Sequence, residues 1–364
     1  MMSLEKEGVL WLSLDRRRWE WDLDKVRSRE LPSNVADYFA DTIGRLPAEV
    51  KSALTLLSCF GARSERSLME TLESLLSLRL VQPMEVATLE GLLIKTEGQF
   101  CFSHDRVQEA AYERTRPEER PLLHFKYGIA LASTALERND NNLLFVAVGQ
   151  INRGRPMAMT PAEDDSKRAL IAQMNLRIGR ESMARSDFAS AYSFFDNGIS
   201  FLQKGHWKEN YNLSFELFEA AAKCALVLGD LAGLNILSEQ VLKFARSFED
   251  KLPVLYVSTC SLACANKLPE CIEQACSVLA QLGENFPSEC FPEDTIRTMV
   301  EQTRVILDGF TEEDLLDHKQ MRSRSKATAM RFLAILETVT QYAKPDMQPI
   351  VTLKSVQFSI AFGM

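Results

Sequence analysis

Residues 186–198, which read SDFASAYSFFDNG, carry the pattern that decides the fold of most of this chain. Small and large side chains recur around this stretch at helical spacing. Small residues allow two helices to approach closely, and large residues fill the space between neighbouring helix pairs. The stretch therefore predicts a hairpin of two helices that needs stacked neighbours to bury its apolar face. The positions expected to pack are Gly179, Phe188, Ala191, Phe195 and Gly198.

The pattern returns twice further along the chain. Leu231 and Leu234 follow the turn at Gly229-Asp230, and Leu268 and Cys271 follow the turn at Asn266-Lys267. The intervals exceed the roughly 34 residues of a tetratricopeptide repeat (TPR). We therefore predict a degenerate TPR-like array over residues 166–364. Apolar residues continue to Phe362, whereas an array should end on a polar helix, so we expect its C-terminal end to be incomplete.

Composition supports a mainly α-helical chain. Glycine (16) and proline (13) are scarce among 364 residues, which argues against a sandwich or a barrel. The net charge of −8 and the lack of a basic block argue against nucleic acid as a partner. No apolar run is long enough to span a membrane, and no secretory signal precedes the first strand. With only eight cysteines we expect reduced thiols and a cytoplasmic location.

Motifs for catalysis or metal binding are missing from the sequence. There is no Gly-Lys dipeptide for a phosphate-binding loop, no Gly-x-Gly turn, no His-Glu-x-x-His and no Gly-x-Ser-x-Gly. Cys260, Cys264, Cys271 and Cys276 do not have the paired spacing of a zinc knuckle, so we interpret them as small apolar packing residues. We therefore expect no catalytic residue, no metal and no enzyme activity in this chain.

The first part of the chain divides into three segments. Residues 1–32 contain two alternating runs, the second being Trp19-Glu20-Trp21-Asp22-Leu23, which predict a hairpin and linker whose tryptophan face needs a cover. Residues 33–120 contain helical patterns followed by a glycine-turn hairpin over 92–102, the layout of a winged helix. Residues 121–165 predict connecting helices.

A winged helix often reads DNA with its third helix, but many such domains only contact proteins. Glu85 and Glu90 lie in the third helical segment, and Arg79 is the one basic residue close to it. This acidic character disfavours DNA recognition.

Residues 102–112, FSHDRVQEAAY, place polar residues directly after the predicted hairpin. Free N–H groups at the start of a helix attract anions, so His104 could donate to a phosphate there. Ser103 is placed to cap this helix, with Arg106 three residues on. In the alternative interpretation, His104 and Asp105 simply complete the turn and cap the helix. The residues alone favour this structural role.

The same run, followed by Arg120 and by Leu123-His124, resembles a signature of large signalling ATPases of the STAND class of AAA-related NTPases. Members of that class often lie between a protein kinase-like domain and GAF plus histidine-kinase modules. The segments Trp19-Glu20-Trp21-Asp22, Leu46-Pro47 with Cys59-Phe60-Gly61, and Gln150-Ile151-Asn152-Arg153-Gly154 resemble other parts of that family, in the same order.

The resemblance implies that an NTPase core, binding ATP or ADP with Mg, precedes this region. No such core is in this sequence, so no cofactor is expected in the chain itself. In related switches a His-Asp pair after the winged-helix hairpin helps to hold the ADP-bound state. His104 and Asp105 match that pair, and with Arg106 they are the candidate nucleotide-sensing residues.

Three functions compete at this point. The first is a regulatory and scaffold region of a signalling ATPase, in which the repeats bind a protein partner or ligand and the winged helix relays binding to an NTPase core in cis or on a partner. The second is a stand-alone TPR-like adaptor. The third, which the acidic balance disfavours, is a DNA-binding regulator.

Overall fold

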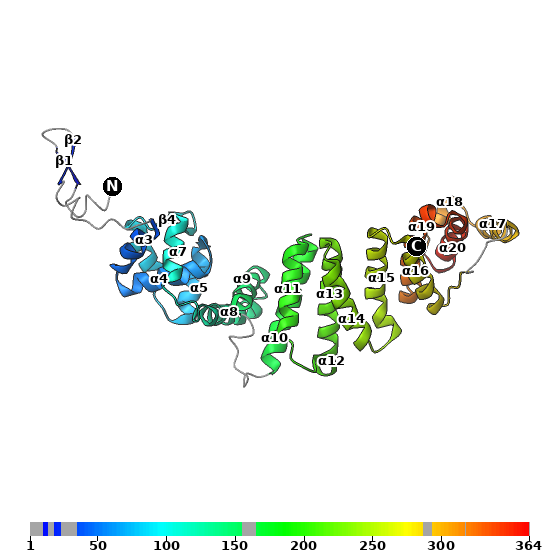
Figure 1. Ribbon diagram of the computed structural model, residues 1–364, viewed down its shortest axis with the longest axis horizontal. Helices are drawn as coiled ribbons and strands as arrows, with labels where there is room; N and C mark the ends of the chain where they lie inside the picture. The colour runs from blue at the N-terminus through cyan, green and yellow to red at the C-terminus, as the bar shows by residue number, and fades with distance from the viewer. Residues whose placement is uncertain are drawn as a thin grey trace. The chain divides into compact units, whose positions relative to one another are not determined.

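The computed structural model describes residues 10–13, 18–22, 35–154, 165–286, 293–316 and 318–363. The chain is mainly α-helical, as predicted, with a few short strands near its N-terminus. It separates into two compact units, Met1–Met159 and Thr160–Met364 (Figure 1). No helix of the described residues is long and apolar enough to cross a membrane.

A small antiparallel hairpin lies at the N-terminus. Strand β1 (Leu10–Ser13) pairs with β2 (Arg18–Trp21), so that Leu10 lies opposite Trp21 and Leu12 opposite Trp19. The expected exposed aromatic face is present, since Trp21 is 55% exposed and Trp19 39%. The sequence also predicts a polar turn from Asp15 to Arg18. Its residues 15–17, Leu23 and the linker to residue 32 fall outside the described residues, and Arg18 is the first residue of β2.

The first unit combines helices with a three-stranded sheet. The predicted hairpin at 92–102 is present, with a turn at Gly98 (φ +77°). The sequence reasoning missed a further strand, which pairs with the second arm of that hairpin and gives the order β3-β5-β4. The elements up to this sheet are α3 (Val35–Gly44), α4 (Ala48–Cys59), β3 (Arg63–Glu65), α5 (Arg66–Leu76), α6 (Val81–Leu89), β4 (Leu93–Thr96) and β5 (Gln99–Phe102).

Three more helices complete this unit: α7 (Asp105–Glu113), α8 (Arg120–Glu137) and α9 (Asn141–Gly154). Helices α8 and α9 pack closely, because glycines stand where the two backbones meet. A Cβ on Gly128 would lie 2.7 Å from the side chain of Ile151, and one on Gly154 would lie 2.7 Å from Phe125. This tight helical pair carries several polar residues of the candidate site.

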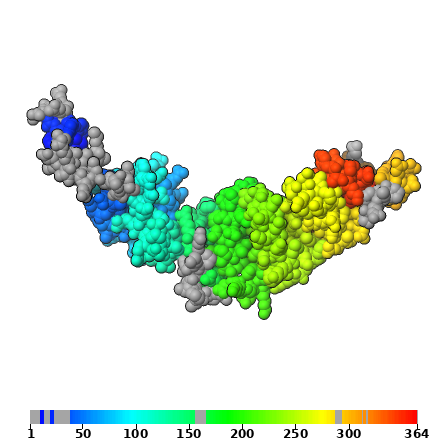
Figure 2. All heavy atoms as spheres, in the orientation of Figure 1, coloured from blue at the N-terminus to red at the C-terminus, as the bar shows by residue number. Residues whose placement is uncertain are grey.

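The second unit is an array of helices, in which α10 to α16 pack largely on their neighbours in the chain (Figures 1 and 2). The array begins with α10 (Asp165–Ala184), α11 (Phe188–Phe201), α12 (His206–Glu209), α13 (Tyr211–Leu228) and α14 (Leu231–Phe244).

The later helices depart from this order, because α16 packs on α19 and α17 packs on α20. Helix α19 ends at Ala343, and Pro345 begins a short 3₁₀ helix, η2. Pro349 lies in the first turn of the following helix, α20, and does not interrupt it. These elements are α15 (Phe248–Cys264), α16 (Leu268–Gln281), α17 (Glu293–Leu307), α18 (Glu312–Leu316), α19 (Arg324–Ala343), η2 (Pro345–Met347) and α20 (Gln348–Phe362).

The three turns singled out in the sequence have one shared geometry. Ser186, Gly229 and Asn266 all adopt positive φ angles, of 62°, 75° and 57°. The residue after each then precedes a helix, and Asp187 and Asp230 accept hydrogen bonds from the third residue on, which caps α11 and α14. All three turns therefore share a left-handed residue two positions before a helix, and in two of them an aspartate caps that helix.

Most of the predicted packing residues lie in helix contacts. Gly179, Ala191, Phe195, Leu234 and Cys271 are buried, and Phe188 and Leu268 are partly buried. A Cβ on Gly179 would clash with the Phe195 ring, so these two residues are matched in size.

The prediction that Leu231 packs between helices is wrong, because this residue is 41% exposed. It is the first residue of α14, directly after the Asp230 cap, and it is Leu234, one turn later, that enters the core. The thiol of Cys271 donates to the Thr259 carbonyl at 3.4 Å, which fits a packing role for this cysteine.

Candidate functional site

His104 is the N-cap of α7. Its Nδ1 accepts a hydrogen bond from the Arg106 N–H at 3.1 Å, while its backbone is extended. The cap is therefore His104 and not Ser103, whose own N–H donates to the Leu92 carbonyl and closes the hairpin. The imidazole also stacks with Phe39 of α3, at 6.3 Å between ring centroids.

Asp105 and Arg106 occupy the first turn of α7, and both are exposed. The Arg106 guanidinium donates to Glu109 at 2.5 Å, so its charge is already paired within the helix. The three predicted residues are thus adjacent, but their side chains have different roles. His104 caps the helix, Arg106 forms an ion pair, and Asp105 lines a cleft.

That cleft, called here the α7 cleft, has a volume of about 470 Å³. It lies between the end of α4, one face of α7, and the polar residues of α8 and α9. Because α4 ends at Cys59, the carbonyls of its last turn face this opening. The lining residues are Ser58, Cys59, Gly61, Asp105, Gln108, Glu109, Tyr112, His124 and Arg153.

A chain of hydrogen bonds forms one side of the α7 cleft. The imidazole of His124 bridges the Tyr112 hydroxyl (2.9 Å) and the Gln150 amide oxygen (2.6 Å). The Gln150 amide nitrogen donates to the Cys59 carbonyl at 3.0 Å, and Arg153 donates to the same carbonyl at 2.8 Å. The network therefore ties α7, α8 and α9 to the end of α4.

Two titratable side chains of the α7 cleft, His124 and Cys59, are uncharged near pH 7. Burial lowers the pKa of His124. The hydrogen bond to Gln150 opposes this shift, the cations Arg153 and Arg120 add to it, and the net direction is downward, so the imidazole is neutral at pH 7. Burial raises the pKa of the Cys59 thiol to about 11, which leaves it protonated and unreactive. Within the described residues, no group of three or more His, Cys, Asp or Glu side chains could hold a metal ion.

Sequence reasoning reached part of this site. It named Asp105, but His124, Gln150 and Arg153 entered only through the family resemblance, and nothing in their spacing connected them with Cys59. The sequence did contain one signal for these residues. Gln150 and Arg153 are three residues apart, so they are expected to share one face of a helix.

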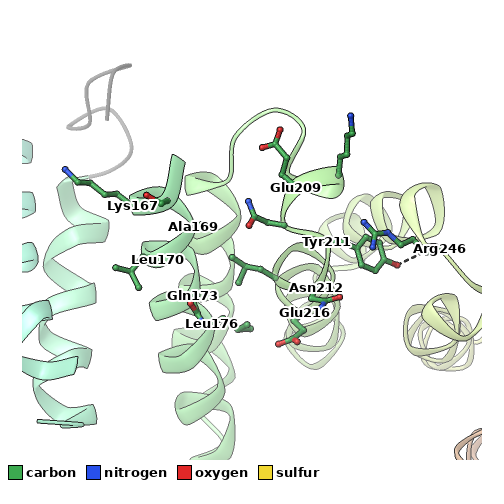
Figure 3. Close-up of a pocket in the computed structure, with 14 residues that line it drawn as sticks. Lys167, Ala169, Leu170, Gln173, Leu176, Glu209, Tyr211, Asn212, Glu216 and Arg246 are labelled. Atoms are coloured by element: carbon green, nitrogen blue, oxygen red, sulfur yellow. Dashed lines mark hydrogen bonds between the residues drawn. The ribbon is translucent and has the colours of Figure 1, made fainter. Parts of the chain in front are cut away.

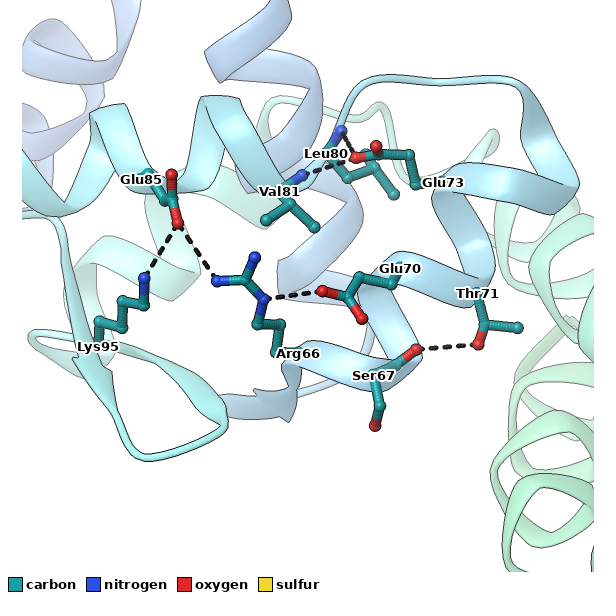
Figure 4. Close-up of polar contacts among 9 residues, drawn as sticks. All are labelled: Arg66, Ser67, Glu70, Thr71, Glu73, Leu80, Val81, Glu85 and Lys95. Carbon is teal, nitrogen blue, oxygen red and sulfur yellow. Dashed lines mark hydrogen bonds and ion pairs between the residues drawn. The ribbon is translucent and has the colours of Figure 1, made fainter.

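A second polar cluster surrounds α6 (Figure 4). Glu85 on α6 accepts from Lys95 at 3.0 Å and from Arg66 at 3.3 Å, so it pairs with two nearby cations. On the same helix Val86 and Leu89 are exposed, Leu89 by 81%. The outer face of α6 is therefore apolar and acidic, which is the opposite of a phosphate-binding surface.

In the second unit, an open groove of about 1040 Å³ runs between α10 and the α12–α13 segment (Figure 3). We call it the repeat groove. Tyr211 stands at one side, where its hydroxyl accepts from the Arg246 N–H and donates to Asp250, and its ring lies 3.9 Å below the Arg246 guanidinium. The lining residues are Ser166, Lys167, Ala169, Leu170, Gln173, Leu176, Lys208, Glu209, Asn210, Tyr211, Asn212, Leu213, Glu216 and Arg246.

No family model matches the chain. Among curated proteins it is similar to hybrid signal transduction histidine kinase G of Dictyostelium discoideum, at 18% identity over 345 residues that cover 78% of this chain. The chain spans 10% of that relative's length.

Among solved structures it is similar to a Signal Transduction ATPase with Numerous Domains (STAND) protein with a tetratricopeptide repeat sensor from Pyrococcus horikoshii. That match has a TM-score of 0.29 and 13% identity, and covers 92% of this chain and 50% of the other. Both relatives are named as signal-transduction proteins.

Proposed function

We propose that residues 1–364 form a non-catalytic regulatory region of a signal-transduction ATPase. In this proposal the helical array binds a protein partner, and the first unit relays that event to a nucleotide-binding core outside these residues. ATP or ADP with Mg would bind that core, and not the chain described here. The observation that carries the proposal is the position of His104, which caps α7 and directly precedes Asp105, a residue that lines the α7 cleft.

The order of elements in the first unit supports this role. Helices α4, α5 and α6, with β3 and the β4-β5 hairpin, follow one another as in a winged helix. Helix α7 begins where that hairpin ends, so a ligand contact at His104 would act on both. The network through His124 and Gln150 then connects α7 with α8 and α9.

His104 retains the capacity for a ligand contact. Its Nδ1 is used by the cap, and its side chain is exposed, so Nε2 can still donate to an anion. Asp105 lies in the same turn and lines the α7 cleft. A nucleotide phosphate contacted by His104 would thus couple directly to the start of α7.

The names of the two similar proteins agree with a signalling role. One is a histidine kinase of which this chain corresponds to a tenth, and the other is a STAND protein with a repeat sensor. A region of this kind within a longer signalling protein is what the proposal requires.

The first experiment is to sequence the complete transcript around this reading frame. The proposal expects a Gly-x₄-Gly-Lys-Ser/Thr loop upstream of Met1. A stop codon in frame immediately upstream of Met1 and another directly after Met364 would contradict it.

The second experiment measures ADP release from the full-length protein carrying His104→Ala or His104→Asn. Asparagine is a good helix cap, so it restores the structural role but not an imidazole contact. The proposal expects both variants to release ADP at least tenfold faster than wild type. If only the alanine variant changes, His104 acts purely as a cap and the nucleotide contact is wrong. Glu118→Gln, outside the α7 cleft, serves as the control.

The adaptor hypothesis also has an observation in its favour, which is the open repeat groove in the second unit. It expects partner binding that does not change with ATP or ADP. DNA binding is the weakest of the three functions, because Glu85 pairs with Arg66 and Lys95 on the face of α6 that would have to meet phosphates.

A further inference from the structure

We propose that the repeat groove binds an acidic, extended segment of a partner polypeptide. The inference deepens the proposed function, on which it depends for the role of the array as the partner-binding unit. It rests on the charges, the open volume and the mixed surface of the groove itself.

The repeat groove presents three cationic side chains. Lys167, Lys208 and Arg246 line it and all three are exposed. In the described part of the chain, the ion pairs leave these three side chains without a carboxylate. The Arg246 guanidinium stacks on the Tyr211 ring, which holds it at the groove without neutralising it.

The carboxylates of the groove do not cancel these charges. Glu216 forms an ion pair with Arg180 at 2.8 Å, which neutralises its charge. Glu209 is the other acidic residue of the lining and lies on the short helix α12. Among the described residues of the lining a positive excess therefore remains, in a chain whose net charge is −8. Such a local reversal of sign favours an anionic partner and excludes a basic one.

The remaining lining suits a polypeptide more than a lone anion. Leu170 is 46% exposed, which offers an apolar contact beside the cations. The amides of Gln173, Asn210 and Asn212 can bond to the backbone of an extended chain. The groove is also open and about 1040 Å³ in volume, large enough for several residues. Glutamate or aspartate interspersed with an apolar residue matches this surface.

The test selects from a library of random 12-residue peptides displayed on phage, using the full 364-residue chain as bait. Three baits are compared: wild type, Lys167→Glu/Lys208→Glu, and the control Lys126→Glu/Lys267→Glu. The control reverses two exposed lysines outside the groove, so both variants have the same net charge. We expect wild type and control to enrich peptides with an excess of Asp and Glu, and the groove variant to lose them.

The most enriched peptide is then labelled, and its affinity is measured by fluorescence anisotropy. We expect at least tenfold weaker binding to the groove variant, at most a twofold change in the control, and weaker binding as NaCl rises from 0.1 to 0.5 M. Replacing its acidic residues by Gln and Asn should cause a similar loss. Circular dichroism checks that each variant is folded.

Several outcomes would overturn the inference. Absence of an acidic excess on wild type would do so, and so would equal losses in the groove variant and the control. Enrichment of neutral or apolar peptides would end the acidic assignment and leave the partner-binding role of the array standing. The proposed function is tested separately, through ADP release, so the two failures can be told apart.

Discussion

The Nδ1 atom of His124 lies 2.6 Å from the Oε1 atom of Gln150, and this contact joins α8 to α9 at the edge of the α7 cleft. His124 is buried, and its other ring nitrogen is bonded to Tyr112. One imidazole therefore holds three helices together, provided that it stays neutral.

This contact predicts a pH-dependent stability. Burial lowers the pKa of His124, so the folded chain binds this proton less tightly than the unfolded chain, where histidine titrates near pH 6.5. The stabilisation is complete above about pH 6.5 and declines as the pH falls below it. In urea unfolding at pH 8 and 5.5, wild type should lose more stability than His124→Gln. Burial also lowers the pKa of His206. That residue is present in both proteins, so its contribution to the pH dependence cancels in the comparison. Parallel pH profiles would refute this role for His124.

Gly179 and Phe195 predict an overpacking effect in the array. An added Cβ would clash with the Phe195 ring, so Gly179→Ala should destabilise the second unit by about 1–3 kcal/mol. Adding Phe195→Leu should recover part of that loss. Gly149 in α9 has open space where a Cβ would be added, so Gly149→Ala should be neutral or stabilising. Urea denaturation measures all three, and equal losses at both glycines would contradict the packing assignment.

Ala191 and Leu231 test the register of the repeats. Ala191 is fully buried in α11, so Ala191→Glu buries a charge and overpacks the contact, at a cost of about 2–4 kcal/mol. Leu231, predicted to pack, is 41% exposed, so Leu231→Glu should change the free energy of unfolding by less than about 0.5 kcal/mol. Thermal melts compare the two. A large loss at Leu231 would show that this residue packs after all.

Glu73 predicts a capping effect in the first unit (Figure 4). Its Oε2 accepts hydrogen bonds from the N–H groups of Leu80 and Val81, at 2.7 and 2.9 Å, where α6 begins. These bonds lower the pKa of Glu73, so its contribution is present above about pH 4.3 and is lost as the pH falls below that value. Glu73→Gln should cost about 1 kcal/mol at pH 7, measured by urea unfolding. Glu97→Gln, in the exposed hairpin turn, is the control and should have little effect.

Local patterns in the sequence predicted the helices of the array well, because each depends on residues that are close in the chain. The turns at Ser186-Asp187 and Gly229-Asp230 combine a left-handed residue with a capping aspartate, and both can be recognised from their letters alone. The sequence did not predict the short strand β3, because its three residues have no apolar alternation. This strand forms through its antiparallel pairing with β5.

The site was predicted less completely, for the same physical reason. His104 and Asp105 are adjacent in the chain, so a helix start could be inferred there. Two caps were open from the sequence. Ser103 is not the acceptor, whereas His104, which the structural interpretation names with Asp105, is. The charge pairing of Glu85 with Arg66, nineteen residues earlier, also lay beyond local reasoning.

Periodicity, small residues and turn chemistry were thus enough to establish a mainly helical chain with a repeat array, because these depend on short-range backbone preferences and on apolar spacing. The bond from Gln150 to the Cys59 carbonyl spans 91 positions, and the repeat groove brings Lys167 to the same opening as Arg246. Such groupings were decided only when the helices packed, because side chains far apart in sequence become neighbours through the burial of apolar surface.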